Sequence, residues 1–318
     1  MLANGQTGPA VHIDKLVKRF GDFVAVDDVS IDVAPGEIFG FLGPNGAGKS
    51  TTIRILCGLL APTSGRATVG GFDVATQPEA VKHNIGYMSQ KFSLYDDLTV
   101  QENIEFFGGV YGVSGERLPV RRDYVLKMAG LEDKRRAMTR TLSGGWKQRL
   151  ALGCAILHEP PILFLDEPTS GVDPIARRGF WRLIYDLSEA GHTVFVTTHY
   201  MDEAEYCHRV ALMYGGRVIA LGSPEELKHS LGAGHLLNLD SSDTRGSLTV
   251  LEGKPEILEV AVFGAGLHLK VADPGTAIPR IYEYLQQSGI HVLTLDSIPP
   301  SMEDVFVSLI EKEEKAAA

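Results

Sequence analysis

The segment GPNGAGKST at positions 43–51 has the composition of a loop that binds phosphate. Glycines let successive backbone N–H groups point into one concavity, and a helix that starts at the loop adds partial positive charge there. A lysine in this position reaches the β- and γ-phosphates of a nucleotide, and the next hydroxyl ligates Mg²⁺. The sequence predicts a phosphate site formed by Gly43, Pro44, Asn45, Gly46, Ala47, Gly48, Lys49, Ser50 and Thr51, with Ser50 on the metal.

Two carboxylates, Asp166 and Glu167, directly follow the apolar run ILFL at 162–165. In a parallel sheet, the carboxyl ends of the strands line the ligand crevice. We expect Asp166 to hold Mg²⁺ through water and Glu167 to face the γ-phosphate as the general base for an attacking water.

An α/β fold would position these groups, and the sequence shows the alternation of strands and helices that is typical of such a fold. Buried strands are expected at Ile38–Leu42, Ile162–Leu165, Thr193–Thr197 and Arg209–Met213, and short ones at Gly70–Val74 and Asn84–Met88. Alternating segments at Val11–Leu16 and Val29–Val33 favour a half-exposed antiparallel sheet. Helices are expected at Lys49–Leu60, Lys147–His158 and Ala176–Ala190. Strands that alternate with helices predict an α/β core with parallel strands.

Two further regions differ from this core. Residues 91–140 have no strand signal and form a predicted helical insert, with helices at Val100–Tyr111 and Arg121–Ala129. Gly222, Ser223 and Pro224 then break the pattern. We expect a core domain over 10–230, a small α+β module over 231–312 and a frayed tail over 313–318. The module is expected to contain strands at Leu248–Leu251, Ile257–Phe263, Leu267–Val271 and His291–Leu295, and helices at Ala277–Ser288 and Met302–Ile310.

Composition narrows the class of function. The 318 residues carry 30 Lys+Arg against 40 Asp+Glu, a net charge of −10. Fifteen of the acids but only seven of the bases follow position 221. Nucleic-acid binders usually show a basic patch, so no nucleic acid is expected as a partner.

The three cysteines lie far apart and without a CxxC pair, which favours buried thiols over disulfides or zinc. The first ten residues lack the basic start and apolar core of a signal peptide. No apolar run approaches the roughly 20 residues that cross a bilayer. The sequence therefore predicts a chain that is itself soluble and cytoplasmic.

The order of motifs resembles that of ABC-type ATPases. LSGGWKQRL at 142–150 is similar to the signature motif of that family, and SGVD at 170–173 and His199 look like its D-loop and switch histidine. Gln90 occupies the place of the Q-loop, and Phe20 that of the aromatic that stacks on adenine. The resemblance spans about 10–230 and implies a P-loop NTPase core with an antiparallel β subdomain and a helical insert.

The resemblance also implies roles for individual residues. Ser143, Gly144 and Gly145 would bind nucleotide, Asp173 would couple two sites, His199 would stabilise the γ-phosphate and Gln90 would contact nucleotide and metal. Two positions depart from the family: Trp146 replaces the usual Gln, and Phe20 the usual Tyr. Phe20 keeps the stacking face, and the Ser-Gly-Gly donors remain at a helix N-terminus.

The family works as a head-to-tail dimer, either homo- or heteromeric, with ATP between the phosphate loop of one subunit and Ser143–Trp146 of the other. The resemblance implies an ATPase, using ATP and Mg²⁺, that drives a separate integral membrane permease from the cytoplasmic face of the inner (cell) membrane. GWKQRL, TSGVDP and the closing PSMEDVF resemble drug-efflux ATPases of ABC-2-type, daunorubicin-resistance-like exporters. The cargo would be drugs or other hydrophobic compounds.

Two other functions remain open at this level. A non-transport ABC ATPase acting on the ribosome or nucleic acid is the main alternative, although such proteins usually carry two cassettes and basic linkers. A P-loop kinase or GTPase is disfavoured by the signature motif and by the lack of a base-reading NKxD motif.

Overall fold

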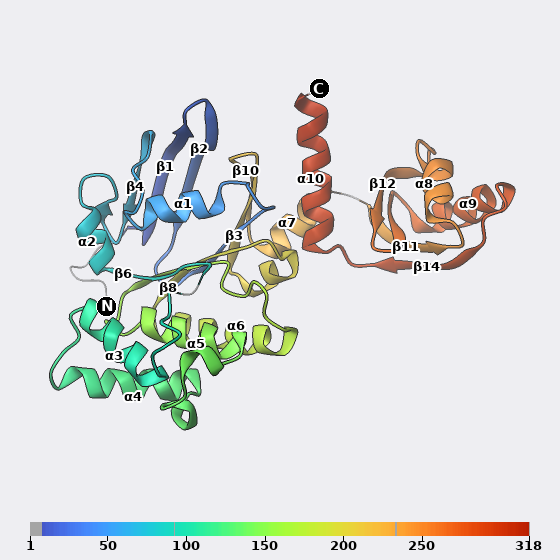
Figure 1. Ribbon diagram of the computed structural model, residues 1–318. Coiled ribbons are helices and arrows are strands. Elements are labelled where there is room, and N and C mark those ends of the chain that lie inside the picture. Colours follow the sequence, from blue (N-terminus) through green and yellow to red (C-terminus); the bar gives the residue numbers. More distant parts are fainter. Residues whose placement is uncertain (1–7, 92, 233, 318) are drawn as a thin grey trace. The chain divides into compact units, whose positions relative to one another are not determined.

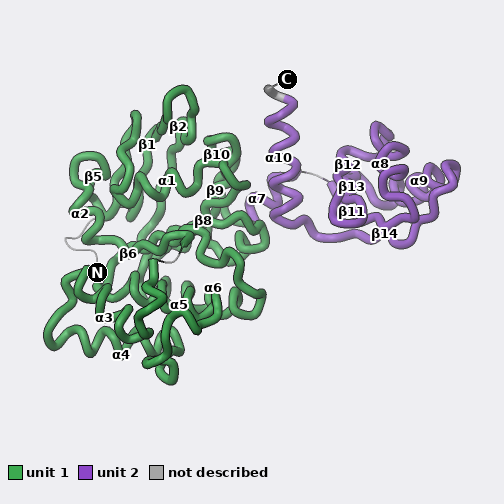
Figure 2. Tube along the Cα trace, viewed as in Figure 1, with its two compact units in different colours: residues 1–224 green, residues 225–318 purple. Residues whose placement is uncertain are grey.

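The computed structural model describes residues 8–91, 93–232 and 234–317. The chain divides into two compact units, 1–224 and 225–318 (Figure 2). This division puts most of helix α7 (Pro224–Ser230) in the C-terminal unit, whereas the sequence pattern places the boundary after residue 230.

A four-stranded antiparallel sheet of order β2-β1-β4-β5 opens the N-terminal unit. Its two long strands form a hairpin in which Phe20 pairs with Phe23 at the closed end. The strands are β1 (Val11–Phe20), β2 (Phe23–Val33), β4 (Ser64–Val69) and β5 (Phe72–Asp73). The turn between β4 and β5 contains Gly70 and Gly71, both at positive φ, where the sequence pattern suggested a strand.

The central sheet has six strands in the order β10-β9-β3-β8-β7-β6. Five of them are parallel and only β10 is antiparallel. Because parallel strands are buried on both faces, they read as apolar runs in the sequence. The strands are β3 (Ile38–Leu42), β6 (Ile85–Met88), β7 (Ile162–Asp166), β8 (Thr193–Thr198), β9 (Arg209–Tyr214) and β10 (Arg217–Gly222).

Helix α1 (Lys49–Leu56) packs in the hydrophobic core that joins the two sheets. This core combines Ile13 of β1 and Ile53 of α1 with Phe41, Phe164 and Phe195 of the central sheet. Helices α5 (Gly144–Ala155) and α6 (Pro174–Glu189) lie on the other side of the central sheet (Figure 1). The phosphate loop is therefore held at both ends, by buried strand β3 and by buried helix α1.

The helical insert contains α3 (Val100–Val110) and α4 (Arg117–Ala129) and packs against α5. Thr99 starts α3 with a capping box, since its side chain accepts from the Glu102 N–H and Glu102 bonds back to the Thr99 N–H. The buried amide of Asn103 donates to the Tyr95 carbonyl and to the Thr139 hydroxyl, and thereby joins the two ends of the insert.

The C-terminal unit contains a four-stranded antiparallel sheet of order β12-β13-β11-β14. Helices α8 (Thr244–Leu251) and α9 (Pro274–Gln287) share a core with one face of this sheet, which includes Leu237, Leu269 and Ile281. Its elements are β11 (His235–Ser241), α8 (Thr244–Leu251), β12 (Ile257–Phe263), β13 (Gly266–Val271), α9 (Pro274–Gln287), β14 (Val292–Ile298) and α10 (Met302–Ala317).

Some further expectations from the sequence differ from the structure. The predicted strand Leu248–Leu251 is wrong, because these residues end helix α8, whose first turn is capped by Asp243. Where the sequence suggested a frayed tail over 313–318, helix α10 continues to residue 317, with an ion pair between Lys315 and Glu311; residue 318 lies outside the described residues, and fraying of the tail stays a prediction. The short helix α2 (Pro78–His83) was not expected.

None of the helices in the described ranges is long and apolar enough to cross a membrane. The thiols of Cys57, Cys154 and Cys207 are free and buried, as expected. Burial raises the pKa of each thiol, because the thiolate would lose its hydration.

Candidate functional site

Backbone geometry explains the glycines of the phosphate loop. Gly43, Gly46 and Gly48 all have positive φ, and at two of them a Cβ would also clash with backbone oxygen. A Cβ on Gly43 would lie 2.2 Å from the Met213 carbonyl oxygen, and one on Gly48 would lie 2.3 Å from the Ala25 carbonyl oxygen. Only glycine lets the loop pass this close to neighbouring strands, so the loop conformation is set by tertiary packing as well as by its own sequence.

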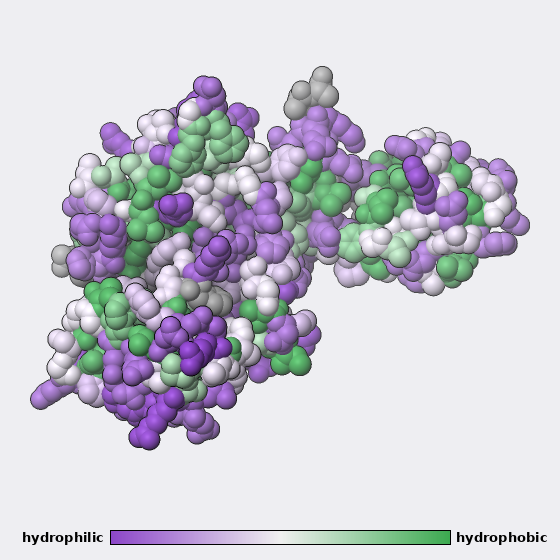
Figure 3. Space-filling view, in the orientation of Figure 1, coloured by the Kyte–Doolittle hydropathy of each residue, from purple (hydrophilic) through white to green (hydrophobic). Residues whose placement is uncertain are grey.

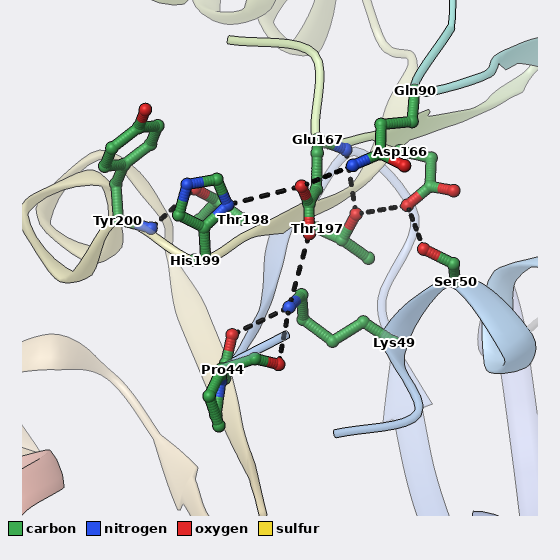
Figure 4. Close-up of polar contacts among 11 residues, drawn as sticks. Pro44, Lys49, Ser50, Gln90, Asp166, Glu167, Thr197, Thr198, His199 and Tyr200 are labelled. Atoms are coloured by element: carbon green, nitrogen blue, oxygen red, sulfur yellow. Dashed lines mark hydrogen bonds and ion pairs between the residues drawn. The ribbon is translucent and has the colours of Figure 1, made fainter. Parts of the chain in front are cut away.

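Lys49 is nearly buried and has three oxygen partners (Figure 4). Its ammonium donates to the Gly43 carbonyl at 2.7 Å and to the Pro44 carbonyl at 3.0 Å, and lies 3.3 Å from Oε1 of Glu167. Burial lowers the pKa of this lysine, and the charge of Glu167 opposes that shift. The ammonium is thus fixed at the loop, next to a carboxylate.

Asp166 lies at the end of β7 and accepts two hydroxyl hydrogen bonds on Oδ1. The donors are Ser50 Oγ at 3.0 Å and Thr197 Oγ1 at 2.8 Å. Burial raises the pKa of Asp166, while the two hydroxyl donors and Lys49 oppose the shift. A buried carboxylate beside the Ser50 hydroxyl is an oxygen donor set of the kind Mg²⁺ prefers, so these residues fit the predicted metal. The structure brings Ser50 and Asp166, both expected at the metal, into direct contact; their binding of Mg²⁺ stays a prediction.

Glu167 joins two predicted residues that come from distant segments. Gln90 Nε2 donates to Glu167 Oε2 at 2.9 Å, and His199 Nδ1 lies 3.2 Å from the same oxygen (Figure 4). Glu167 itself adopts φ 47°, an uncommon value for a non-glycine residue, and its N–H donates to the Thr197 side chain and carbonyl. Gln90 contacts Glu167 rather than Ser50 or Asp166 here, so its role at the metal stays a prediction.

An open cavity of about 400 Å³ adjoins these groups. Its lining includes Asn45, Gly46, Gly48, Lys49, Ser50, Thr51, Gln90 and Glu167, together with Phe23 and Ala25 of β2. Phe23 was missed in the sequence, where only Phe20 stands at the family position. Phe20 is half-exposed at the end of β1, with the Lys18 ammonium 5.1 Å from its ring centre, and is not among the residues that line this cavity. Stacking of adenine on Phe20 stays a prediction.

The signature segment lies elsewhere in the same unit. Ser143 is the exposed N-cap of α5, and its side chain makes no capping hydrogen bond. Gly145 packs so close to α6 that an added Cβ would lie 2.9 Å from Cβ of Ala176. Asp173 caps α6 by accepting from the N–H groups of Ile175 and Ala176. The predicted residues therefore form two groups: the phosphate cavity, and a surface that joins Ser143–Gly145 to the start of α6.

Trp146 extends this second surface. Its half-buried ring lies near two cations, with the Lys134 ammonium at 5.2 Å and the Arg149 guanidinium at 5.5 Å from the ring centre. An added Cβ on Gly130, at the end of α4, would lie 3.7 Å from the indole. The residue that departs from the family motif therefore packs against the helical insert.

A phosphate loop on β3 and α1, with carboxylates at the end of β7, defines the class of the protein as a P-loop nucleotide hydrolase. Comparisons with known proteins give the family. The family profile "ABC transporter" matches residues 26–170, and the profile "ATP-binding protein DrrA1-3-like, C-terminal domain" matches 222–310. A profile for an AAA domain described as a putative AbiEii toxin also matches 140–201.

Curated relatives of this chain are also ATP-binding proteins of transporters. The probable multidrug ABC transporter ATP-binding protein YbhF of Escherichia coli K12 is 53% identical over 69% of this chain, which spans 38% of that relative. The Nod factor export ATP-binding protein I of Rhizobium etli is 36% identical, with 96% and 94% of the two chains covered. The daunorubicin/doxorubicin resistance ATP-binding protein DrrA of Streptomyces peucetius is 37% identical over 96% and 94%. This chain belongs to the ATP-binding proteins of ABC transporters, and it is an ATPase.

A solved structure supports the fold. The ATP-binding cassette MJ0796, described as a dimer in a post-hydrolysis state bound to ADP and Pi, aligns with a TM-score of 0.61 and 30% identity. The alignment covers 67% of this chain and 98% of that one. YbhF, the Nod factor export protein and DrrA all carry the names of transporter or export proteins. The alternative of an ATPase that acts on the ribosome or nucleic acid is therefore not favoured.

Proposed function

We propose that two ATP-binding units of this kind close head to tail around two ATP molecules and that hydrolysis reopens them. Lys49 and the backbone N–H groups of residues 45–51 bind the phosphates, and the base stacks on Phe20. Glu167 takes a proton from the attacking water. His199, 3.2 Å from Glu167, orients this carboxylate and stabilises the charge on the γ-phosphate. Ser50, Asp166 and Gln90 would hold Mg²⁺, which when bound would supply positive charge to neutralise the phosphate oxygens.

One observation carries the proposal of a shared site: the signature residues Ser143 and Gly144 do not line the phosphate cavity of their own chain. The residues that line it all come from the loop, from β2, from Gln90 and from Glu167. Ser143 and Gly144, at the N-terminus of α5, are exposed instead, and an added Cβ on Gly144 would meet nothing within 4 Å. An exposed helix N-terminus suits the γ-phosphate held by a partner subunit. Asp173 lies on the same surface and would couple the two sites.

A mixing experiment tests the shared site. Lys49→Ala disables the phosphate loop and Ser143→Ala the signature, so each variant alone should have at most about 1% of wild-type turnover, as expected for losing transition-state contacts. In a mixed dimer, one of the two sites combines an intact loop with an intact signature. Mixing the two variants should therefore restore ATPase activity well above the sum of the separate proteins. If the mixture is only additive, or if Ser143→Ala is fully active, the site is not shared.

We further propose that the closing motion drives a membrane permease, and that the chain sits at the cytoplasmic face of the inner membrane through it. The helical insert offers a docking surface of aromatic side chains. Tyr95 and Phe106 are 49% and 43% exposed, their ring centres lie 4.7 Å apart, and Phe107 contacts both. This cluster follows Gln90 closely in the chain, so a partner bound there would respond to events at Glu167.

The names of the relatives support export as the direction, since they include drug resistance and Nod factor export. Drugs or other hydrophobic compounds are the proposed cargo. Sedimentation with membranes from cells that make the whole transporter tests the docking surface. Phe106→Glu should release the chain, whereas Val120→Glu, at an exposed valine of α4, should not. Equal retention of both variants would place the permease contact elsewhere.

A further inference from the structure

A buried ion pair joins the start of α6 to the segment that follows His199. Nε of Arg177 lies 3.6 Å from Oε1 of Glu203, which belongs to the 3₁₀ helix η3 (Met201–Tyr206). Hydrophilic side chains cover much of the face of the N-terminal unit that Figure 3 shows, where water solvates them. Glu203 by contrast is 0% exposed, and the Arg177 side chain is 18% exposed. Because removing two charges from water is costly, such a pair is weak evidence for a role in stability alone.

The pair is held by charge and not by hydrogen bonds. Neither carboxylate oxygen of Glu203 has a hydrogen-bond partner among the described residues, and the same is true of Nε of Arg177. A second carboxylate, that of the exposed Asp202, lies 3.6 Å from Nη1 of Arg177. Buried polar groups that forgo hydrogen bonds are uncommon, so each calls for an explanation. Here the explanation lies in where the two acids hold the guanidinium.

The guanidinium of Arg177 faces the ring of Tyr200. Its central carbon lies 3.9 Å from the ring centre, within the range of a cation–π contact. The Tyr200 ring lies beside the imidazole of His199, with 4.2 Å between the ring centres (Figure 4). Nδ1 of His199 is in turn 3.2 Å from Oε2 of Glu167. A continuous series of contacts therefore leads from α6 to the proposed general base.

The imidazole of His199 needs a packing surface to fix its orientation. The backbone next to it is anchored, since the Tyr200 N–H donates to Oγ1 of the buried Thr198 at 3.0 Å. The imidazole itself is 28% exposed, and among the described residues it hydrogen-bonds only with Glu167. A catalytic side chain keeps a productive geometry when packing and outer contacts lock its rotamer. The Tyr200 ring supplies that packing, and Arg177 holds the Tyr200 ring.

We propose that Arg177 is a positioning residue for ATP hydrolysis, which fixes the ring of Tyr200 and thereby the imidazole of His199. The ion pair with Glu203 keeps the guanidinium in place. This inference rests on the proposed function, in which His199 stabilises the charge on the γ-phosphate. The Arg177 N–H also donates to the Asp173 carbonyl at 2.9 Å. Arg177 would thus connect the residue proposed to couple the two sites with the histidine at the γ-phosphate.

A double-mutant cycle in the full-length chain tests whether Arg177 acts through His199. The test variant combines Arg177→Met with Glu203→Gln, so that no buried carboxylate is left without its cation. It should lower kcat for ATP hydrolysis about three- to thirtyfold, the usual range for residues that act through a neighbour. KM for ATP should stay unchanged, because the phosphate loop is untouched. In a His199→Ala background, the same two substitutions should have no further effect on kcat.

Further variants separate positioning from folding. Arg182→Met removes a positive charge from an exposed position on the same helix and should change neither kcat nor thermal stability. Tyr200→Leu should lower kcat by a factor similar to that of the test variant, and the conservative Tyr200→Phe, which keeps the ring, should restore it. These two variants give the same answer in the cycle with His199→Ala if the test variant does not fold.

The outcomes distinguish this inference from the proposed function. If the test variant keeps wild-type kcat, or loses the same factor with and without His199, Arg177 does not position the histidine and the proposed function is unaffected. If His199→Ala itself hydrolyses ATP at the wild-type rate, the role proposed for His199 fails, and the inference about Arg177 fails with it.

Discussion

The ammonium of Lys49 lies 3.3 Å from Oε1 of Glu167, and both side chains are almost fully buried. The two residues are far apart in the sequence, one at the start of α1 and the other just after β7. In the proposed mechanism, one binds phosphate and the other activates water. A bound phosphate that attracts the Lys49 ammonium would also release the Glu167 carboxylate from this ion pair. Nucleotide binding would thereby make Glu167 available to accept a proton from water.

The first prediction concerns Glu167→Gln. Gln keeps the size of the side chain and can still accept from Gln90, but it cannot take a proton. Hydrolysis should fall about 10²- to 10⁴-fold, the usual contribution of a general base, while ATP binding persists. Single-turnover ATPase assays and size-exclusion chromatography with MgATP provide the measurements. We expect the variant to accumulate as a closed dimer, and wild-type hydrolysis by this variant would remove Glu167 from the role of base.

The second prediction concerns Asp166→Asn. Burial raises the pKa of Asp166 in the folded state, so its ionised form is less stable there than in the unfolded chain. The stability cost is absent below the unfolded pKa of about 3.9 and develops as the pH rises through the folded-state value. Thermal unfolding of the protein without nucleotide should therefore show the variant to be at least as stable as wild type at pH 7, with no such advantage near pH 3.5.

Thermal unfolding of the Asp166→Asn variant with and without Mg²⁺ distinguishes an effect on metal binding from an effect on folding stability. Wild-type protein should gain thermal stability from ATP with Mg²⁺ beyond that from ATP with EDTA. Asp166→Asn should lose most of this difference, because the Ser50 hydroxyl is then left without its carboxylate partner. A variant that is destabilised at pH 7 yet still responds to Mg²⁺ as wild type would contradict both expectations.

The third prediction concerns Asp173, which holds two roles that can be separated. Its carboxylate caps α6, and the proposed dimer also uses it between the two sites. Asp173→Ala should cost about 1 kcal/mol of folding free energy in urea unfolding, the typical loss for a helix cap. Asp173→Asn should keep the cap and the stability. If Asp173→Asn nevertheless loses ATPase activity, the loss comes from coupling and not from the fold.

The fourth prediction uses Trp146 as a reporter. The chain has two tryptophans, and the indole N–H of the other, Trp181, has no hydrogen-bond partner among the residues that the structure describes. Trp181→Phe should therefore be tolerated and leave Trp146 as the single emitter. In a background of Glu167→Gln, MgATP should change its fluorescence as the second subunit closes over Ser143. The matched variant Trp146→Phe should show no such change, and a response carried by Trp181 would contradict the assignment.

The fifth prediction concerns the buried thiols Cys57, Cys154 and Cys207. Their pKa values are raised by burial, so the folded state keeps them protonated where the unfolded chain ionises. Stability from this source is complete below the unfolded pKa of about 8.5 and is lost as the pH rises above it. Iodoacetamide at pH 8 should leave all three unmodified in the native protein and label them in guanidinium. Labelling of native protein would show that a thiol is accessible.

Some elements of the fold can be predicted from the sequence because they depend on residues that are neighbours in the chain. Strand β3 was expected at Ile38–Leu42 and is found there, since an apolar run that stops at a glycine turn has few alternatives. The strand predicted at Leu248–Leu251 is wrong, because a short apolar run is compatible with either a strand or a helix. The feature that decides for a helix is the N-cap at Asp243. Strand β11 was missed even though Leu237 and Leu239 alternate in it, and it lies between β13 and β14 in the sheet.

The sequence by itself determined the chemistry: a loop whose glycines, lysine and hydroxyl suit phosphate, and two carboxylates after a buried strand. Those properties depend on neighbours in the chain. The tertiary structure decided which groups meet. It placed Gln90 and His199 on one oxygen of Glu167, put Phe23 at the phosphate cavity, and left Ser143 outside that cavity. Such contacts depend on strand order and on packing between distant segments, which residue spacing along a chain does not encode.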